Sequence, residues 1–74
     1  LGTLYLRLSR FTEGAKVLER AVALRPEADG FSNLGWACLR LGRRDDAARS
    51  LRSALALDPD HEQARRGLDE LNRR

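Results

Sequence analysis

The chain has 74 residues, enough for one small domain whose single core supplies only a few kcal/mol of net stability. Its 14 Lys and Arg residues against 11 Asp and Glu residues give a net charge of +3, with both signs interspersed along the chain. This mixture is typical of solvated helix faces and disfavours a basic stripe for nucleic acid. A single cysteine excludes an internal disulfide, and no stretch reaches the roughly 20 apolar residues of a membrane span. We therefore expect a soluble protein, compatible with the cytoplasm.

The sequence contains an internal repeat with a period of 33 residues. Residues 34–41 read LGWACLRL and echo residues 1–8, which read LGTLYLRL. Residues 54–59 read ALALDP and echo residues 21–26, which read AVALRP. Because both halves of the unit recur at the same offset, the chain is predicted to stack copies of one supersecondary unit. The chain begins inside an apolar run, so we expect it to be the C-terminal end of a longer array.

Residues 1–26 are predicted to form two helices. Thr12 is a candidate N-cap for the second of them. The apolar stripe of that second helix starts at Ala15 and runs to Val22 with helical spacing. Pro26 ends the helix, because the residue before a proline disfavours the helical conformation.

Residues 27–59 are predicted to form a second helix pair. Gly42 ends the first helix of this pair, and Asp45 begins the second, where an acidic residue suits the helix dipole. Pro59 follows its end. The core face of the first helix is predicted to carry Phe31, Leu34, Gly35, Cys38 and Leu41. The core face of the second helix is predicted to carry Ala47, Ala48, Leu51, Ala54 and Leu55.

A fifth helix is predicted to start at Asp60, whose side chain can cap it while Gln63 reaches back in a capping box. We expect His61 in the solvated first turn of this helix. Its apolar residues are few: Ala64, Leu68 and Leu71.

With these elements placed, the repeat resembles the tetratricopeptide repeat, whose pattern is W-x2-L-G-x2-Y, then A-x3-F, then P. The second unit meets this pattern with Phe31, Leu34, Gly35, Cys38, Ala47, Leu51 and Pro59. The first unit meets it with Leu1, Gly2, Tyr5, Gly14, Leu18 and Pro26. The period is one residue shorter than the usual 34, and we expect Gly30 to absorb the tighter connection.

The resemblance implies an all-α fold, a right-handed superhelix of antiparallel helix pairs of the α-solenoid type, here with about five helices. Residues 1–26 would be a first repeat lacking its opening residues, and residues 27–59 a second repeat. Residues 60–74 would be a C-terminal helix like those that cap such arrays. A helical repeat of this kind implies a scaffold for protein binding.

The resemblance also implies that a peptide or partner helix binds in a concave groove lined by the first helix of each pair. The family's groove-facing positions correspond here to Thr3, Leu6, Arg7, Ser32, Asn33, Trp36, Leu39, Arg40, Gln63, Arg66 and Glu70. Trp36 stands apart from the signature tryptophan position, which Phe31 occupies, and exposed tryptophan and arginine are frequent binding hot spots. Two interpretations stay open, because Trp36 either faces the groove or packs against Thr3 or Leu6.

The predicted partner is another protein or a peptide, of acidic or amphipathic character. Two alternatives from other classes remain: a structural module that self-associates as a homo-oligomer or stacks on further repeats, and weak nucleic-acid binding through the arginines. A clamp for a C-terminal carboxylate is disfavoured, since Asn33 fits one of its positions but Thr3 replaces a second asparagine.

No catalytic residue, cofactor or metal ligand is predicted, and we do not expect an enzyme. His61 and Cys38 are single occurrences without partners at ligand spacing. Cys38 takes a core position of the family and is expected to be a buried small hydrophobe.

Overall fold

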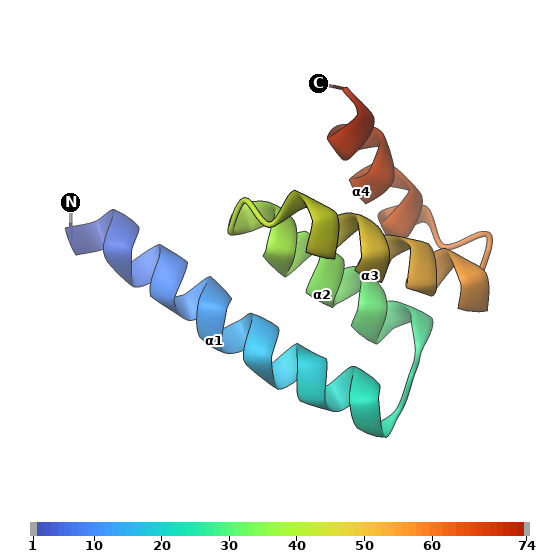
Figure 1. The fold of residues 1–74 in the computed structure, drawn as a ribbon, viewed down its shortest axis with the longest axis horizontal. Coiled ribbons are helices and arrows are strands. Elements are labelled where there is room, and N and C mark those ends of the chain that lie inside the picture. Colours follow the sequence, from blue (N-terminus) through green and yellow to red (C-terminus); the bar gives the residue numbers. More distant parts are fainter. Residues whose placement is uncertain (1, 74) are drawn as a thin grey trace.

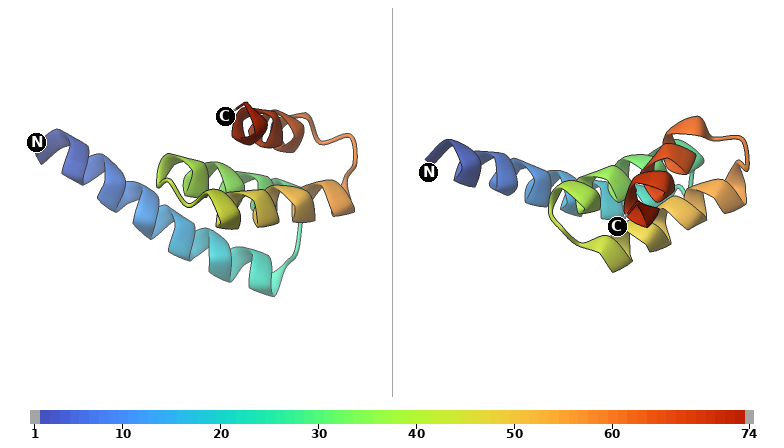
Figure 2. Two further views of the ribbon diagram at one scale, coloured as in Figure 1. Left: turned by 45° about the horizontal axis from the view of Figure 1, so that its top comes forward. Right: turned by 90° about the horizontal axis from the view of Figure 1, so that it is seen from above.

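The structure is a computed structural model that describes the backbone of residues 2–73 and the side chains of residues 10–73. It contains four helices, α1 (Gly2–Leu24), α2 (Ala28–Arg40), α3 (Arg44–Leu57) and α4 (Glu62–Asn72), and no strand in the described part of the chain (Figure 1). The predicted all-α helical-repeat fold is confirmed. The helices form three layers, with α1 on one side of the α2 and α3 pair and α4 on the other (Figure 2).

The α2–α3 pair is an antiparallel hairpin whose tight connection depends on Gly42. This residue has φ 78°, a left-handed conformation that glycine adopts without a steric penalty. The turn lets the Arg43 N–H donate to the Cys38 carbonyl at 2.9 Å, which satisfies a carbonyl at the end of α2. Asp45 and Asp46 lie in the first turn of α3, where negative charge complements the helix dipole.

The first unit differs from the prediction, because α1 is one continuous helix of 23 residues. Ser9 stands at the position that Gly42 occupies in the second unit. A left-handed conformation at a residue with a Cβ costs roughly 1–2 kcal/mol, so the helix continues through this position. Thr12 consequently lies inside α1 and caps no helix start, and four helices replace the expected five. The first turns of α1 project beyond the other helices (Figures 1 and 2).

The core consists of two clusters, one on each side of the α2–α3 pair. The first contains the buried residues Ala15, Leu34, Cys38 and Ala47, which come from α1, α2 and α3. The second contains Leu51, Ala54 and Ala64, from α3 and α4. The predicted core faces of α2 and α3 are therefore confirmed for these residues, including the buried Cys38.

Small residues set how closely the helices approach. A Cβ atom on Gly35 of α2 would lie 2.6 Å from Leu51 Cγ, and one on Gly67 of α4 would lie 2.7 Å from Leu51 Cδ1. Gly30 serves the same purpose, since its Cβ would lie 3.0 Å from Val22 Cγ1. Gly30 lies in the first turn of α2 with a negative φ, just after the connection, and its part in the shorter period stays a prediction.

The start of α4 also differs from the prediction. His61 is the N-cap, and its Nδ1 accepts a hydrogen bond from the Ala64 N–H at 3.3 Å. The Asp60 N–H instead donates to Asp58 Oδ1 at 3.2 Å in the preceding turn. The expected capping box of Asp60 and Gln63 is therefore wrong, because the turn at Asp58 moves the helix start by one residue.

Over the part of the chain that the structure describes, no helix combines the length and the apolar character needed to cross a bilayer.

Candidate functional site

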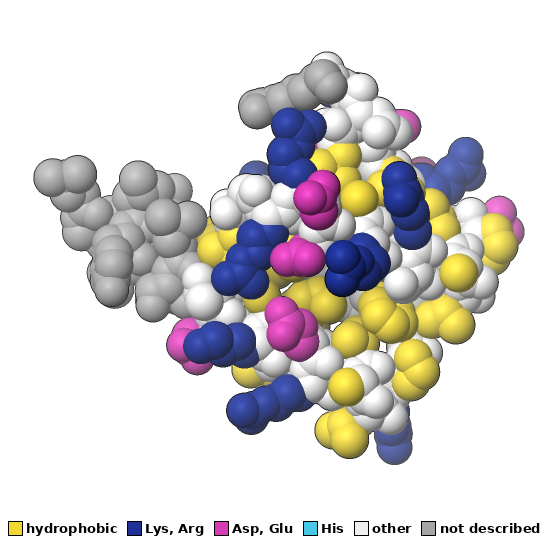
Figure 3. All heavy atoms as spheres, viewed as in Figure 1, with side chains coloured by type: hydrophobic (Ala, Val, Ile, Leu, Met, Phe, Trp, Pro, Cys, Tyr) yellow, Lys and Arg dark blue, Asp and Glu magenta, His cyan; other side chains and the backbone are white. Residues whose placement is uncertain are grey.

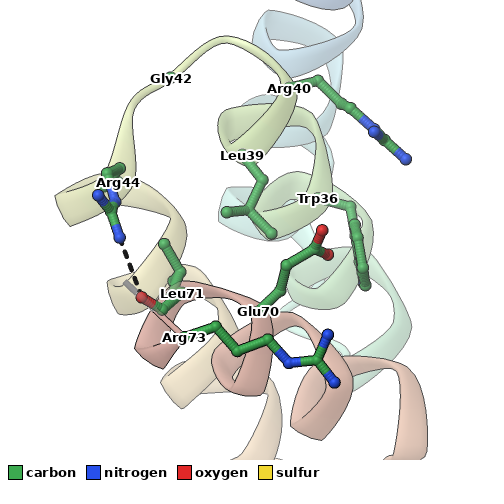
Figure 4. Close-up of a pocket in the computed structure, with 8 residues that line it drawn as sticks. All are labelled: Trp36, Leu39, Arg40, Gly42, Arg44, Glu70, Leu71 and Arg73. Atoms are coloured by element: carbon green, nitrogen blue, oxygen red, sulfur yellow. Dashed lines mark hydrogen bonds between the residues drawn. The ribbon is translucent and has the colours of Figure 1, made fainter.

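The surface between α2 and α4 carries a row of hollows, which we call the α2–α4 groove. The first of these hollows measures ≈ 360 Å³ and opens to solvent between the end of α2 and the end of α4 (Figure 4). The residues that line it are Trp36, Leu39, Arg40, Gly42, Arg44, Glu70, Leu71 and Arg73. A second hollow continues past Trp36 toward the start of α4 and includes Gln63 and Arg66. Trp36 is therefore shared by both hollows.

Trp36 is anchored to α4. Its indole Nε1–H donates to the Gln63 carbonyl at 3.1 Å, and its ring packs against the cluster that contains Leu51. The Arg40 guanidinium lies 5.9 Å from the ring centroid, within the range of a cation–π contact. The side chain is half-buried, so one part of the ring holds α4 on α2 and another borders the groove.

The charges around the first hollow are mostly positive. Arg40 and Arg73 are exposed at its rim, while the Arg44 Nη2 donates to the Leu71 carbonyl at 2.9 Å (Figure 4). Glu70 contributes the one carboxylate of the first hollow and points into the space between Leu39 and Trp36 (Figure 4). The first hollow therefore combines an aromatic surface with arginines and a single acid.

Arg66 is the one arginine that lines the second hollow, beside Asp58, Asp60 and Glu62. It pairs with Glu62 at 3.5 Å, but both side chains are exposed, at 73% and 81%. An exposed pair at this spacing on a helix contributes only about 0.3–0.5 kcal/mol. Arg66 is therefore available to exchange Glu62 for an acidic group on a ligand.

The structure brings six of the eleven predicted groove residues together. These six are Trp36, Leu39, Arg40, Gln63, Arg66 and Glu70. Leu39 also packs against both core clusters, as expected of an inter-repeat contact. Asn33 is exposed on α2 one turn before Trp36. The side chains of Thr3, Leu6 and Arg7 lie outside the described residues, and so does any contact between them and Trp36.

Ser32 does not line the groove. Its side chain is fully buried, at 0% exposure, and its Oγ has no hydrogen-bond partner. Ser32 lies one helical turn before Trp36 on α2. A peptide cannot reach it without displacing the packed helices.

Three further residues, Arg44, Leu71 and Arg73, line the first hollow without having been predicted there. Leu71 was expected only as a core residue. The Gly42 turn places the start of α3 beside the end of α4, which is how Arg44 reaches Leu71 (Figure 4). The sequence signal for this arrangement is the glycine itself, since it fixes where α3 begins.

Cys38 and His61, the single cysteine and the single histidine of the chain, both have structural roles. Burial raises the pKa of the Cys38 thiol, and the nearby Asp46 carboxylate adds to this effect, so the reactive thiolate is disfavoured. His61 is only 11% exposed and its Nε2 lies 2.6 Å from Asp29 Oδ1, so the expectation of a solvated histidine is wrong. Because Nδ1 accepts the capping bond, Nε2 carries the proton and donates to Asp29. Among the described residues, no three His, Cys, Asp or Glu side chains converge as a metal site requires.

Comparison with known proteins identifies the repeat. No curated protein and no solved structure matches the chain. A family model described as tetratricopeptide repeat matches residues 1–62, which include α1, α2, α3 and the start of α4. The match covers most of the chain and agrees with the helix pairs and the small residues at their contacts. The chain belongs to the tetratricopeptide repeat family.

Proposed function

We propose that the α2–α4 groove binds an extended acidic peptide from another protein. Tetratricopeptide repeats are interaction modules without catalytic activity of their own, and their stacked helices present a concave surface to a partner. The observation that carries the proposal is the position of Trp36, half-buried between two hollows with the Arg40 guanidinium 5.9 Å from its ring centroid.

The arginines around the first hollow favour an acidic group on the ligand at that end. Arg40 and Arg73 are exposed there, and arginine binds carboxylates through paired, directional hydrogen bonds. Glu70 inside this hollow would accept a hydrogen bond from a peptide N–H or pair with a basic side chain, and so would Asp58, Asp60 and Glu62 along the second hollow. A ligand with acidic residues and one donor near Trp36 therefore fits better than a uniformly acidic one.

The dimensions of the groove suit a short segment. The 11 residues of α4 span about 16 Å, which is the length of roughly five residues of extended chain. The apolar ring of Trp36 supplies a contact for one aromatic or aliphatic side chain near the centre of that segment. An affinity in the micromolar range is typical of so small a contact.

The experiment starts from a displayed library of short peptides selected on the immobilised chain. Binding of a selected peptide is then followed by the emission of Trp36, the single tryptophan of the chain. The variant Arg40→Glu/Arg66→Glu is expected to weaken binding at least tenfold, or about 1.4 kcal/mol. Arg20→Glu/Arg52→Glu is the matched control, because it changes the net charge equally at exposed positions of α1 and α3.

Equal losses in the two variants would contradict the proposal, since the effect would then reflect net charge alone. The same emission signal tests nucleic acid as the ligand. Random duplex DNA is expected to bind only at low salt. Binding of duplex DNA that survives moderate salt would favour the arginine-based alternative.

A further inference from the structure

The α2–α4 groove lies between two helices that run in the same direction. At one end of the groove, the Nε2 atom of His61, the N-cap of α4, lies 2.6 Å from Asp29 in the first turn of α2. At the other end, Arg40 is the last residue of α2 and Arg73 directly follows α4, and both line the first hollow (Figure 4). The starts of both helices therefore lie at one end of the groove and their ends at the other.

Both helices carry acidic residues at their starts and arginines at their ends. Asp29 is in the first turn of α2 and Arg40 is in its last turn. Glu62 is in the first turn of α4, and Arg73 is its C-cap. Charges placed in this way complement the dipole of each helix. Because the two helices are parallel, their charges add to one another across the groove instead of cancelling.

The two hollows consequently differ in the sign of their charge. Among the described residues, the charged groups that line the first hollow are Arg40, Arg44, Arg73 and Glu70. Those that line the second hollow are Asp58, Asp60, Glu62 and Arg66, beside His61. The first hollow therefore has a surplus of positive charge and the second a surplus of negative charge. Trp36 lines both hollows and stands between the two surpluses.

This separation of charge is a feature of the groove and not of the whole surface. On the face of the molecule where α3 lies in front, acidic and basic side chains are mixed (Figure 3). Within the groove, a hollow beside Trp36 joins Arg66 and Arg73 to Asp69 and Glu70, so the two signs balance there. A ligand that follows the groove thus passes from a positive end, across a balanced middle, to a negative end.

We propose that the groove selects a peptide with the opposite order of charges. Acidic residues of the peptide lie against the first hollow, an apolar side chain contacts Trp36, and a basic residue lies against the second hollow. This inference rests on the proposed function and specifies its ligand. Since α4 spans about 16 Å, the acidic and basic residues of an extended peptide are about five positions apart. The backbone of the peptide can run in either direction, because both directions can present the same charges.

The first test is the charge pattern of the peptides that the immobilised chain selects from the displayed library. Selected peptides are then made with acetylated and amidated ends, so that only their side chains carry charge. We expect an acidic and a basic residue about five positions apart, with an apolar residue between them. Replacing the basic residue with glutamate is expected to weaken binding by about threefold or more at low salt. The loss should shrink at high salt, and the emission of Trp36 measures both affinities.

The variant Asp60→Lys tests whether the basic residue of the peptide lies at the second hollow. The Asp60 N–H, and not its carboxylate, bonds to Asp58, so the substitution keeps the turn before α4. This variant is expected to reverse the preference, so that the glutamate-substituted peptide binds more tightly than the selected one. Glu13→Lys is the matched control, because it changes the net charge equally at an exposed position of α1, away from both hollows. It should leave the preference between the two peptides unchanged.

The outcomes separate this inference from the proposed function. Selected peptides that are acidic at both ends would overturn the inference and leave peptide binding in the groove intact. Equal changes of preference in Asp60→Lys and Glu13→Lys would also overturn it. If the library gave no binding peptide, the proposed function would fail, and the inference with it. Circular dichroism checks that both variants keep their helices, and the glutamate-substituted peptide tests the charge order on the unchanged chain if one of them does not.

Discussion

Leu51 is fully buried between glycines from two helices, and this contact sets the spacing of α2, α3 and α4. Because Gly67 closes its other side, Leu51 has no room to move when Gly35 gains a methyl group. Gly35→Ala is therefore expected to destabilise the chain by about 1–3 kcal/mol through overpacking. The free energy of unfolding in urea, followed by circular dichroism, measures the change.

Gly14→Ala is the matched control for this effect, because it is the same substitution inside a helix without the close contact. A Cβ on Gly14 meets no atom within 4 Å. It should stabilise the chain by about 0.5–1 kcal/mol through the lower backbone entropy of alanine in the unfolded state. If both substitutions stabilised the chain, Gly35 would not be needed for close approach.

Ser32 offers a second prediction about single residues, because its buried hydroxyl lacks a partner. Removing an unsatisfied buried polar group relieves a desolvation cost of about 1–3 kcal/mol. Ser32→Ala is therefore expected to raise the free energy of unfolding by about 1 kcal/mol and to leave peptide affinity unchanged. Weaker peptide binding at unchanged stability would show that Ser32 faces the ligand after all.

Among the elements, α4 is attached through its N-terminal turn. His61 caps that turn and links it to Asp29 in the first turn of α2, while Trp36 binds the carbonyl of Gln63, two residues further on. These bonds tie α2 to the N-terminal turn of α4. The geometry of the groove therefore depends also on His61 and Asp29, which do not line its first hollow.

A double-mutant cycle with His61→Asn and Asp29→Asn tests this attachment. Asparagine at position 61 retains a capping group but is too short to reach Asp29. We expect a coupling energy of about 0.5–1 kcal/mol, because the Asp29 side chain remains 86% exposed and screened by water. Additive effects of the two substitutions on unfolding would mean that the 2.6 Å contact contributes nothing to stability.

The helices also show which boundaries local sequence patterns predict and which they do not. Apolar periodicity and Gly42 were enough to place α2 and α3. The cap of α4 was misassigned, because His61 acts as a cap with the support of Asp29, a residue 32 positions away. The continuity of α1 was not predicted, because the repeat pattern implied two helices in the first unit. The single change that opposes this is Ser9, which stands where the second unit has Gly42.

At the scale of the whole molecule, the family pattern predicted which helices border the groove. It was less accurate for the individual side chains that line it. Positions transferred to α2 and α4 converged around Trp36, since the pattern records how first helices align in a stack. Ser32 is the exception, because its side chain is fully buried although the family position faces the groove. Arg44 was missed because its position depends on how far the end of α4 reaches across α3.

The central claim is that the α2–α4 groove binds a peptide, and a nuclear magnetic resonance titration tests it most directly. The single indole N–H of Trp36 gives one resolved signal, and its hydrogen bond to Gln63 lies at the centre of the groove. On adding a selected peptide, we expect this signal and the backbone amides around Arg40, Arg66 and Glu70 to shift together at one affinity. Shifts confined to the exposed side of α3 around Arg52, with the Trp36 signal unmoved, would contradict the claim.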